Sequence, residues 1–464
     1  MTMWLPKIDG RSGPKYQAIA DSILDAIRAG DLGPGDRLPP QRELAWKLGV
    51  TVGTVTRAYL VGEQQGVLSG EVGRGTYVRR KPTPISNELL PRNLDNTLRL
   101  TVNASYSSDF ETFLAEALRA IAEKKGLERL LHYMPAAGHP EHRALGAAWI
   151  ARAGYQVPAD QVFLTNGAQQ ALSVAMQVLT RPGEAILTEA LTYTAVLDNA
   201  RNLDRRLHGV AMDEDGVIPE ALEAAAKTTG AKVVLLIPTL QNPTSSTMSD
   251  KRRQLIAKVV ERNDLILIED DVYGLLPMSR PAPIAARIPE RTFYLTSASK
   301  SVAPGLRCGW LVVPRAHAEK VNATIYALNC SHPPLTHEVL RQWIEDGTAD
   351  RMVAQHRSEA AARHAIAGEV LHGLSWHGAP QCFHVLLDLP APWRSEQFVS
   401  SALARGIAVV PASSFAVDKA TAPQAVRISI AAAPDRAQLR DALVTLRDLA
   451  LRGPNHSASV QQVI

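Results

Sequence analysis

The stretch TFYLTSASKSVAPGLRCGW, residues 292–310, joins two apolar runs through a short polar segment that carries one lysine. Residues 292–297 are typical of a strand buried on both faces, and residues 309–313 form a second such run. Lys300 stands between them, just after a strand and before a Pro-Gly turn. A lysine at a strand end is most simply a solvated side chain, so its meaning depends on the rest of the sequence.

Similar apolar runs recur from about residue 101 onward. They lie at 162–165, 185–189, 232–238, 265–270, 292–297 and 309–313. Stretches such as residues 113–125 and 169–179 carry apolar residues at helical spacing between these runs. Short buried strands separated by helices predict an α/β fold with a mostly parallel sheet that is covered on both faces.

Polar residues interrupt this pattern where strands end. Residues 166–169, NGAQ, lie at a strand-to-helix junction, where free backbone N–H groups and the helix dipole favour a phosphate. Asn242 follows another strand and can hydrogen-bond a ligand oxygen. The carboxylate of Asp270 could pair with a protonated ring nitrogen, and the phenol of Tyr273 could reach a neighbouring phenolate. Ser297, Ser299 and Arg307 flank Lys300 and could complete a phosphate cup, with charge-assisted bonds from the arginine.

Each of these residues has a simpler interpretation. Gly167 and Asn242 could be turn residues, Tyr133 and Tyr193 core aromatics, and Arg427 an exposed residue at a sheet edge. Asp270 and its neighbour could cap the strand or bind a metal, but no histidine lies nearby at ligand spacing. The spacing of His377, Cys382 and His384 matches no common metal site, and residues 377–384 are predicted to form a packed strand.

The first 80 residues predict a separate small domain. Ile19, Ile23 and Ile27 mark an amphipathic helix that ends at Gly30, and a second helix runs from Pro40 to Gly49. A third helix, roughly residues 52–65, should place Val52, Val55 and Tyr59 on one face. Residues 67–78 then predict two short strands around a Gly-rich turn with Arg74 at its tip. The order predicts a winged helix-turn-helix, whereas a general three-helix interaction domain would not explain the turn and the basic hairpin.

Composition limits the class of protein without identifying it. The chain has 464 residues, enough for two or three domains, and nearly half of them are apolar. The net charge is +4, and residues 1–80 hold 11 Lys and Arg against 8 Asp and Glu, a surplus of 3 that weakly favours an anionic partner. We expect no membrane span, no secretion signal and a cytoplasmic protein. The three cysteines, Cys308, Cys330 and Cys382, are expected to be reduced thiols.

Residues 12–79 resemble the DNA-binding domain of the GntR family of bacterial regulators. The resemblance rests on the pattern GPGDRLP-x-x-REL-A-x-x-LGV-x-x-x-TV-x-x-AY…G-x-GTYV. It implies that the helix beginning at Thr51 enters the DNA major groove. The DNA contacts that it implies are Arg42, Thr51, Gly53, Thr54, Arg57 and Arg74. Relatives often carry arginine directly after the threonine of the turn, where this chain has Val52, and this departure points to a different operator preference.

Residues 101–450 resemble the fold type I aminotransferases that depend on pyridoxal 5′-phosphate (PLP). The resemblance rests on the order G-A-Q, aromatic, N-P, D-x-x-Y, S-x-S-K, Arg and a late Arg. It implies that Lys300 carries PLP as a Schiff base and shuttles a proton, and that Asp270 keeps the pyridine nitrogen protonated. Tyr273 and Asn242 would bond the ring hydroxyl oxygen, Tyr193 would stack on the ring, and Arg427 would clamp a substrate carboxylate. The phosphate would be held by Gly167, Ala168, Gln169, Ser297, Ser299 and Arg307, with Tyr133 reaching the phosphate of the neighbouring subunit in a homodimer.

A GntR-type head before an aminotransferase-like body is the architecture of the MocR-type regulators, with residues 80–100 as linker and 451–464 as tail. Three functions fit this architecture. The first is a DNA-binding regulator that senses PLP or an amino compound, and the second is a working aminotransferase with an accessory head. The third is a DNA-binding protein whose body binds no cofactor, which the full set of site residues disfavours. The fusion favours regulation, because DNA binding contributes nothing to transamination.

Overall fold

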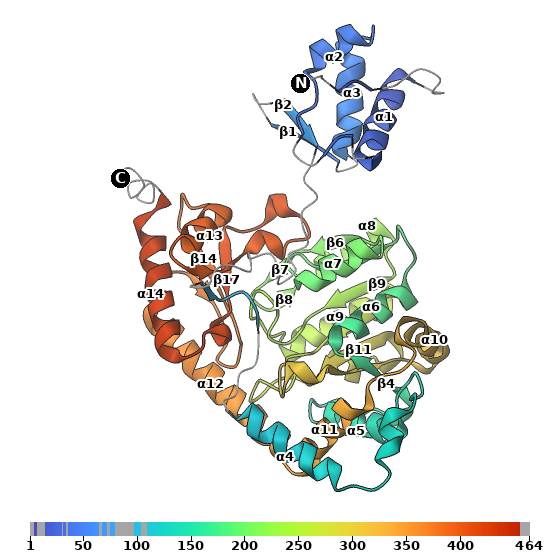
Figure 1. The fold of residues 1–464 in the computed structure, drawn as a ribbon, viewed down its shortest axis with the longest axis vertical. Helices are drawn as coiled ribbons and strands as arrows, with labels where there is room; N and C mark the ends of the chain where they lie inside the picture. Colours follow the sequence, from blue (N-terminus) through green and yellow to red (C-terminus); the bar gives the residue numbers. More distant parts are fainter. Residues whose placement is uncertain are drawn as a thin grey trace. The chain divides into compact units, whose positions relative to one another are not determined.

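The computed structural model describes residues 4–6, 14–29, 31–33, 36–64, 67–71, 75–78, 97–103 and 109–454. The chain divides into two compact units, Met1–Pro91 and Arg92–Ile464, which we call the head and the body (Figure 1). Residues 80–96 of the expected linker and residues 455–464 of the expected tail lie outside the described residues.

The head is a winged helix-turn-helix, as predicted. Its elements are α1 (Lys15–Ala29), α2 (Gln41–Lys47), α3 (Val52–Gln64), β1 (Leu68–Glu71) and β2 (Gly75–Val78). Ile19 and Ile23 of α1 are buried against Val55 and Tyr59 of α3. Val52, on the same face of the helix, is 43% exposed, because it is the first residue of α3 and extends past the end of the buried face.

The wing is attached to the helices through the loop before α2. Strands β1 and β2 pair antiparallel, with Leu68 opposite Val78. The Leu38 N–H donates to the Thr76 carbonyl (2.8 Å), and the Val78 N–H donates to the Asp36 carbonyl (2.8 Å). These bonds fix the hairpin against the helix-turn-helix. Arg74, predicted at its tip, lies outside the described residues.

The body is built on a seven-stranded sheet whose strand order is β4-β12-β11-β10-β9-β5-β6. The strands are β4 (Val162–Asn166), β12 (Cys308–Val312), β11 (Thr292–Ser297), β10 (Ile266–Asp270), β9 (Val233–Leu236), β5 (Ala185–Glu189) and β6 (Arg206–Val210). All neighbours pair in parallel except β12, which is antiparallel to both β11 and β4. The predicted apolar runs are therefore confirmed as strands of a mostly parallel sheet, and the carboxyl ends of six strands share one edge with the start of β12.

Helices cover both faces of this sheet, as the two-sided burial of its strands requires (Figure 1). The helices of the body are α4 (Phe110–Ala122), α5 (Pro140–Ala151), α6 (Ala168–Leu179), α7 (Thr194–Asn202), α8 (Pro219–Thr229), α9 (Asp250–Arg262), α10 (Ala318–Asn329), α11 (Pro334–Glu345), α12 (Thr348–Val370), α13 (Ser395–Leu403) and α14 (Arg436–Arg452). Residues of α6, α7 and α10 pack with Leu235, Phe293 and Leu295 on one face. Residues of α8 and α9 pack with Val234 and Leu267 on the other face.

A smaller subdomain packs beside the large sheet. Its four-stranded sheet has the order β13-β14-β17-β16, and a separate parallel pair joins β15 to β3. The strands are β3 (Leu98–Arg99), β13 (Trp376–His377), β14 (Val385–Asp388), β15 (Ile407–Ala408), β16 (Val410–Pro411) and β17 (Ala425–Ile428), and a short hairpin of the large part consists of β7 (Met212–Asp213) and β8 (Gly216–Val217). Helices α12, α13 and α14 bury this sheet in one apolar core.

The predicted strand over residues 377–384 was wrong. His377 ends β13 and Val385 begins β14, so the segment between them is the turn that joins two antiparallel strands. Gly378 and Pro380, which lie within this segment, explain why the strand is interrupted. Within the described part of the chain, no helix has the length and apolar character to cross a membrane.

Candidate functional site

The polar residues singled out from the sequence meet at the edge of the large sheet where the parallel strands end. Asp270 is the last residue of β10, Lys300 comes three residues after β11, and Gly167 follows β4. Arg307 precedes β12, whose reversed direction brings its first residue to this edge. Parallel strands therefore deliver side chains far apart in sequence to one place, as open α/β sheets generally do.

The amine of Lys300 lies in a partly buried, cation-rich environment. Burial, together with the charges of Arg427 and Arg307, lowers the pKa of Lys300 to about 8, and the nearby charge of Asp270 opposes this shift. The Nζ atom donates a hydrogen bond to the backbone carbonyl of Asn103. A large share of this amine is thus neutral near pH 8, which suits a nucleophile or a proton carrier.

The carboxyl group of Asp270 is buried, with 4% of its surface exposed. Burial raises its pKa to about 7, and so does the charge of Asp271, while the Val272 N–H (3.2 Å) and Lys300 act in the opposite direction. No side-chain ion pair of the described residues neutralises Asp270 within 4 Å. A buried carboxyl group in this state is ready to receive a hydrogen-bonded cation.

Arg427 is a buried cation whose acceptors are all neutral. Its Nη1 donates to Asn242 Oδ1 (3.1 Å), its Nη2 donates to the Thr101 carbonyl, and the guanidinium lies 4.9 Å from the ring centre of Phe415. Its Nε is buried and has no partner among the described residues. Burial lowers the pKa of Arg427 to about 10. The expectation of an exposed edge residue does not hold, because β17 pairs on both sides, with β14 and β16.

Asn103 was missed by sequence reasoning and lies at the centre of the site. Its Nδ2 donates to the Tyr273 hydroxyl (2.9 Å) and to Nδ1 of His384 (2.8 Å), and its Oδ1 accepts from Ser429. Burial raises the pKa of the Tyr273 hydroxyl well above its ordinary value. Burial lowers the pKa of His384 to about 3, so its ring is neutral. No motif marks Asn103 in the sequence, and only the folded chain connects it to its partners.

A glycine and an arginine form the other end of the site. Gly167 has φ +81° and precedes α6, whose first turn has no side-chain cap. The Arg307 Nη2 donates to the Asn166 carbonyl (3.1 Å), and a Cβ atom on Gly167 would lie 2.6 Å from that nitrogen. Uncapped N–H groups, a helix N-terminus and a guanidinium therefore converge where only glycine fits.

The remaining predicted residues divide into two groups. Tyr193 is half-buried, and charges on Asp270, Arg427 and Arg307 all act on its hydroxyl, whose pKa is raised mainly by burial. Ser297 and Ser299 are buried beside Lys300, and the Ser299 N–H donates to Ser297 Oγ (3.3 Å). These residues lie close to Lys300 and Asp270.

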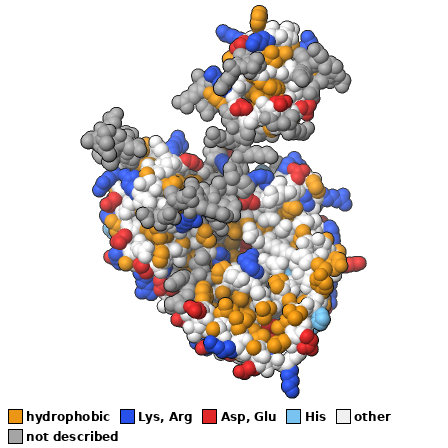
Figure 2. Space-filling view, in the orientation of Figure 1, with side chains coloured by type: hydrophobic (Ala, Val, Ile, Leu, Met, Phe, Trp, Pro, Cys, Tyr) orange, Lys and Arg blue, Asp and Glu red, His pale blue; other side chains and the backbone are white. Residues whose placement is uncertain are grey.

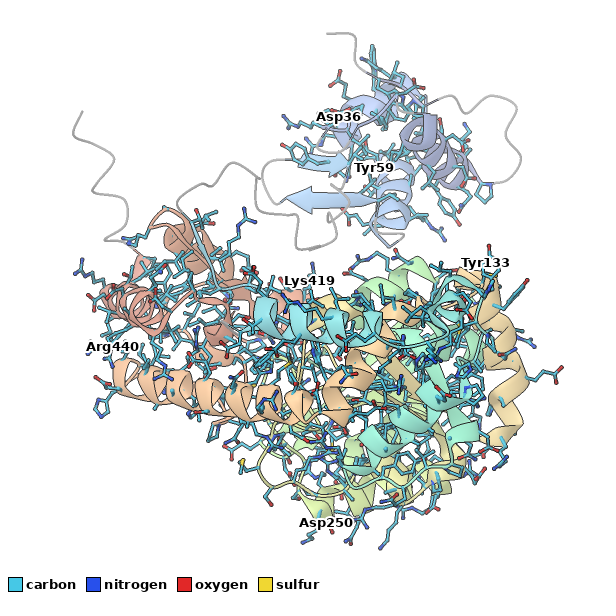
Figure 3. All side chains as sticks on the ribbon, turned by 60° about the horizontal axis from the view of Figure 1, so that its bottom comes forward. Asp36, Tyr59, Tyr133, Asp250, Lys419 and Arg440 are labelled. Atoms are coloured by element: carbon cyan, nitrogen blue, oxygen red, sulfur yellow. The ribbon has the colours of Figure 1, made fainter. Side chains whose placement is uncertain are left out.

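Two further predicted residues, Tyr133 and Gln169, have exposed side chains, and Gln169 lies in the first turn of α6 directly after Gly167 and Ala168. Tyr133 is 86% exposed and lies at the edge of the body (Figure 3). Figure 2 shows hydrophobic side chains gathered on the lower part of the body, where α4 and α11 lie. Exposed apolar side chains in this part include Leu114, Leu118, Leu131 and Leu335.

The turn that precedes β14 contributes to the site without forming a metal centre. Cys382 and His384 are buried, with Sγ 3.4 Å from Nδ1, while His377 pairs with Asp388 (3.0 Å). Among the described residues, no group of three or more His, Cys, Asp and Glu is placed to hold a metal ion.

The predicted DNA contacts of the head lie mainly on the exposed side of α2 and α3. Arg42, Thr51, Gly53 and Arg57 are exposed, and Thr54 is half-buried. Thr51 Oγ1 accepts from the Thr54 N–H (3.2 Å) and lies 2.9 Å from the Thr54 hydroxyl, so Thr51 caps α3. The Arg57 guanidinium lies 4.1 Å from the ring centre of Tyr16 on α1. The polar side chains at the start of α3 are thus already engaged within the head.

Both units match families of known proteins. Residues 95–446 match the family aminotransferase class I and II, and residues 15–78 match the bacterial regulatory proteins of the gntR family. The chain is 30% identical over 448 residues to YdeF of Bacillus subtilis, an uncharacterized HTH-type transcriptional regulator, and the match covers 96% of each chain. It is 25% identical to YdcR of Escherichia coli, another uncharacterized HTH-type transcriptional regulator, over 86% of this chain and 92% of that one.

A solved structure extends the likeness of the body to a ligand-bound enzyme. The α-aminoadipate aminotransferase LysN of Thermus thermophilus, complexed with N-(5′-phosphopyridoxyl)-L-leucine, superposes with a TM-score of 0.70 and 25% identity. The superposition covers 79% of this chain and 94% of LysN.

The chain therefore belongs to the MocR-type regulators, in which a GntR-type helix-turn-helix domain precedes an aminotransferase class I and II domain. It is an HTH-type transcriptional regulator with an aminotransferase-like body, and DNA is the partner that such a head implies. Domains of the aminotransferase class I and II family typically bind PLP.

Proposed function

We propose that the protein is a DNA-binding transcription regulator that senses PLP or an amino compound through its body. Arg427 carries this proposal. Among the described residues, its buried guanidinium has two neutral oxygen acceptors, an Nε without a partner and none of the anions that a buried cation requires. A ligand carboxylate would supply that charge and accept two parallel hydrogen bonds. The ligand class is therefore a compound with an amino group and a carboxylate.

The residues at the sheet edge fit PLP. When bound, PLP supplies an aldehyde that reacts with amines and a ring that withdraws electrons. Lys300 offers an amine whose pKa is lowered to about 8, and Asp270 offers a buried carboxyl group that would hold the pyridine nitrogen in its protonated form. The Arg307 guanidinium approaches Gly167 so closely that a Cβ there would clash with it, and this cation next to the first turn of α6 suits a phosphate.

Other residues would orient the same group. Tyr273 and Asn242 would hydrogen-bond the ring hydroxyl oxygen, and Tyr193 would lie against the ring. The phosphate ligands would be the N–H groups and side chains of Gly167, Ala168, Gln169, Ser297, Ser299 and Arg307. The exposed Tyr133 would act in a homodimer, reaching the phosphate of the neighbouring subunit, and the exposed apolar side chains of α4 and α11 support such an assembly.

In the head, α3 would enter the major groove and its first turn would face the base edges. The proposed DNA contacts are Arg42, Thr51, Gly53, Thr54, Arg57 and Arg74. Val52 stands where relatives often carry arginine, and its 43% exposed side chain has only methyl groups to offer. Methyl groups recognise the C5-methyl group of thymine, so we expect thymine at that position of the operator.

The site also supports a second candidate, a working aminotransferase with an accessory head. The observation that favours it is the pKa of Lys300, because an amine with a pKa of about 8 can both accept and release a proton near neutral pH. Turnover of an amino acid and a keto acid by the purified protein would establish this function.

The visible absorbance of lysine-bound PLP tests the regulator proposal. We expect the full-length protein to show it and Lys300→Ala to lose it, while Lys258→Ala, on the exposed side of α9, keeps it. Wild-type protein that binds no PLP would refute the cofactor assignment. If the protein regulates transcription, it should protect a dimer-sized stretch of DNA upstream of its own gene from cleavage. Absence of such a footprint would favour the second candidate, a working aminotransferase.

A further inference from the structure

The phenol of Tyr273 is a buried donor whose proton has no acceptor among the described residues. Its side chain is 3% exposed, and its ring packs edge-on against Phe383 and His384. Its hydroxyl makes one hydrogen bond within the described part of the chain, which it accepts from Nδ2 of Asn103 (2.9 Å). Burial raises the pKa of this phenol well above its ordinary value, so the oxygen keeps its own proton. A buried donor of this kind indicates a ligand atom that accepts.

The direction of the bond to Tyr273 depends on which way the amide of Asn103 points, and His384 determines it. His384 Nε2 lies 3.2 Å from the backbone carbonyl of Gln241, which can only accept, so the ring carries a proton on Nε2. Burial lowers the pKa of His384 to about 3, and the ring is therefore neutral, with Nδ1 as an acceptor. The Asn103 atom that lies 2.8 Å from Nδ1 is then a donor, which makes it Nδ2 rather than Oδ1.

Two further contacts agree with this orientation of the amide. The hydroxyl of Ser429 donates to Oδ1 of Asn103. The thiol of Cys382 lies 3.4 Å from Nδ1 of His384, and burial raises the pKa of this thiol, so it keeps a proton that Nδ1 can accept. The side chain of Asn103 therefore has one consistent assignment, in which its amide nitrogen donates to both His384 and Tyr273.

The backbone of Asn103 connects this phenol to the reactive amine. The Asn103 carbonyl accepts a hydrogen bond from Nζ of Lys300, while the side chain of the same residue reaches Tyr273. Asn242 also keeps a donor, because its Oδ1 accepts from Arg427 (3.1 Å) and its amide nitrogen makes no hydrogen bond with the described residues. The two residues assigned above to the ring oxygen of PLP thus both have a proton to give, which fits an ionised oxygen.

We propose that Asn103 is a positioning residue that directs the phenolic proton of Tyr273 toward the ring oxygen of PLP, with His384 fixing the orientation of its amide. The inference rests on the proposed function. A donor to the ring oxygen stabilises its negative charge most when the lysine nitrogen bound to PLP has lost its own proton. The donor therefore lowers the pKa of that nitrogen.

Other groups act on the phenol without fixing its direction. Besides Asn103, the groups whose charges influence its pKa are Cys382, Tyr193 and Arg427. None of these three shares a hydrogen bond with the Tyr273 hydroxyl in the described part of the chain. A change at Asn103 should therefore redirect the phenolic proton while the surrounding charges stay in place.

The pH dependence of the visible absorbance of PLP-loaded, full-length protein tests this role. In Asn103→Asp, a carboxylate replaces the amide, so the phenol donates to that carboxylate and no longer to the ring oxygen. We expect the midpoint of the pH titration to rise by about 1–2 pH units, the size expected for one hydrogen bond to a charged oxygen. Tyr273→Phe removes the same donor and should raise the midpoint by a similar amount. Val102→Ala is the matched control, because Val102 is adjacent to Asn103 and 37% exposed, and it should titrate like wild type.

A double variant separates the direction of the proton from the charge that Asn103→Asp introduces. If Asn103 acts through Tyr273, Asn103→Asp should raise the midpoint by less than about 0.5 pH units when Tyr273→Phe is already present. A rise as large in that background as in wild type, or an unchanged midpoint in the single variant Asn103→Asp, would overturn the inference and leave the cofactor site intact. Thermal melting checks that each variant is folded.

Nitrogen-15 NMR of the ligand-free, full-length protein tests the hydrogen bonds without the cofactor and without a variant of Asn103. With labelled histidine, and His384→Gln to identify the signal, His384 should stay neutral with its proton on Nε2 between about pH 6 and about pH 8. A proton on Nδ1, or a ring that becomes charged in this range, would overturn the inference. Wild type that develops no PLP absorbance would instead refute the proposed function, and the histidine spectrum would still decide the direction of the bonds.

Discussion

The first turn of α3 in the head and the strand ends of the body both present chemical groups to a ligand, but they do so in opposite ways. Val52 is 43% exposed, whereas Tyr273, Asp270 and Arg427 are 3%, 4% and 5% exposed. In the head, the hydroxyl groups of Thr51 and Thr54 form a hydrogen bond with each other, and Arg57 lies over the ring of Tyr16. In the body, Arg427 is buried with a nitrogen atom that has no partner among the described residues, and Asp270 forms no ion pair with any of them.

The difference agrees with the ligands proposed above for the two regions. A small molecule is enclosed, so its partners must be desolvated and positioned before it arrives, and each carries a large share of the binding free energy. A DNA duplex stays outside the fold, so its contacts remain solvated and are individually modest. Substitutions in the body should therefore have large effects on ligand binding, and substitutions in the head should change sequence preference by small factors.

Arg427→Gln should produce the largest effect. Loss of a buried charged partner costs about 2–5 kcal/mol, so the amino acid concentration that gives half of the spectral response should rise by about 30-fold to 4,000-fold. The measurement is titration of PLP-loaded protein with a panel of common amino acids, followed by visible absorbance. Arg440→Gln is the control, because Arg440 forms an exposed ion pair with Glu369 (2.7 Å) at the edge of the body (Figure 3). Equal behaviour of the two variants would contradict the carboxylate assignment.

Gly167→Ala should weaken PLP binding by about 50-fold, because a Cβ there meets Arg307 and the backbone requires a positive φ. Gly183→Ala is a matched control with the same φ of +81° and no atom within 4 Å of the added Cβ. Both variants should lose about 1 kcal/mol of stability from the backbone, measured by chemical denaturation. Only Gly167→Ala should lose affinity for PLP, and a comparable loss in both would remove the argument for a phosphate cradle.

The rate of PLP uptake should depend on pH through Lys300. Its pKa is lowered to about 8, so the amine is protonated below that pH and neutral above it. Because the neutral amine is the nucleophile, the rate should rise about 30-fold between about pH 6.5 and pH 9 and level off. Stopped-flow absorbance after mixing ligand-free protein with PLP measures it. A midpoint near the ordinary lysine value of about 10.4 would show that the site does not activate Lys300.

Val52→Arg should have the smallest effect, about a fivefold loss of affinity for the DNA selected by wild type, together with a new preference for guanine. Selection from random-sequence DNA followed by sequencing measures both. Leu60→Arg adds the same charge to an exposed position further along α3 and should raise affinity without changing the preferred sequence. If Val52→Arg selects the same sites as wild type, Val52 does not face the bases.

The sequence predicted the elements that follow local rules. Continuous apolar runs between helices located six of the seven strands of the large sheet, all but the edge strand β6. Glycine and proline positions located the helix ends of the head. The polar residues at the strand ends were recognisable because the chemistry restricts the residue type at each position. Lys300, Asp270 and Gly167 lie at the same edge of the sheet because each lies at or just after the carboxyl end of a strand.

Features that depend on distant segments were not predictable. The reversed direction of β12 and the pairing of β3 with β15 join segments that nothing local connects. Asn103 lies in a stretch with no motif and acquires its partners only through that pairing. The exposure of Val52 was not predictable either, because helical spacing gives the face of a residue but not whether another element covers it.

The pairing of β3 with β15 also sets an order of events during synthesis. Residues 98–100 are bonded to residues around positions 406–408 and 429, which leave the ribosome about 300 residues later. At typical bacterial elongation rates of about 5–20 residues per second, this interval lasts about 15–60 seconds. Throughout it the head can fold, because its core is complete within its own unit. A nascent chain therefore carries a finished DNA-binding domain before it has any means of responding to a ligand.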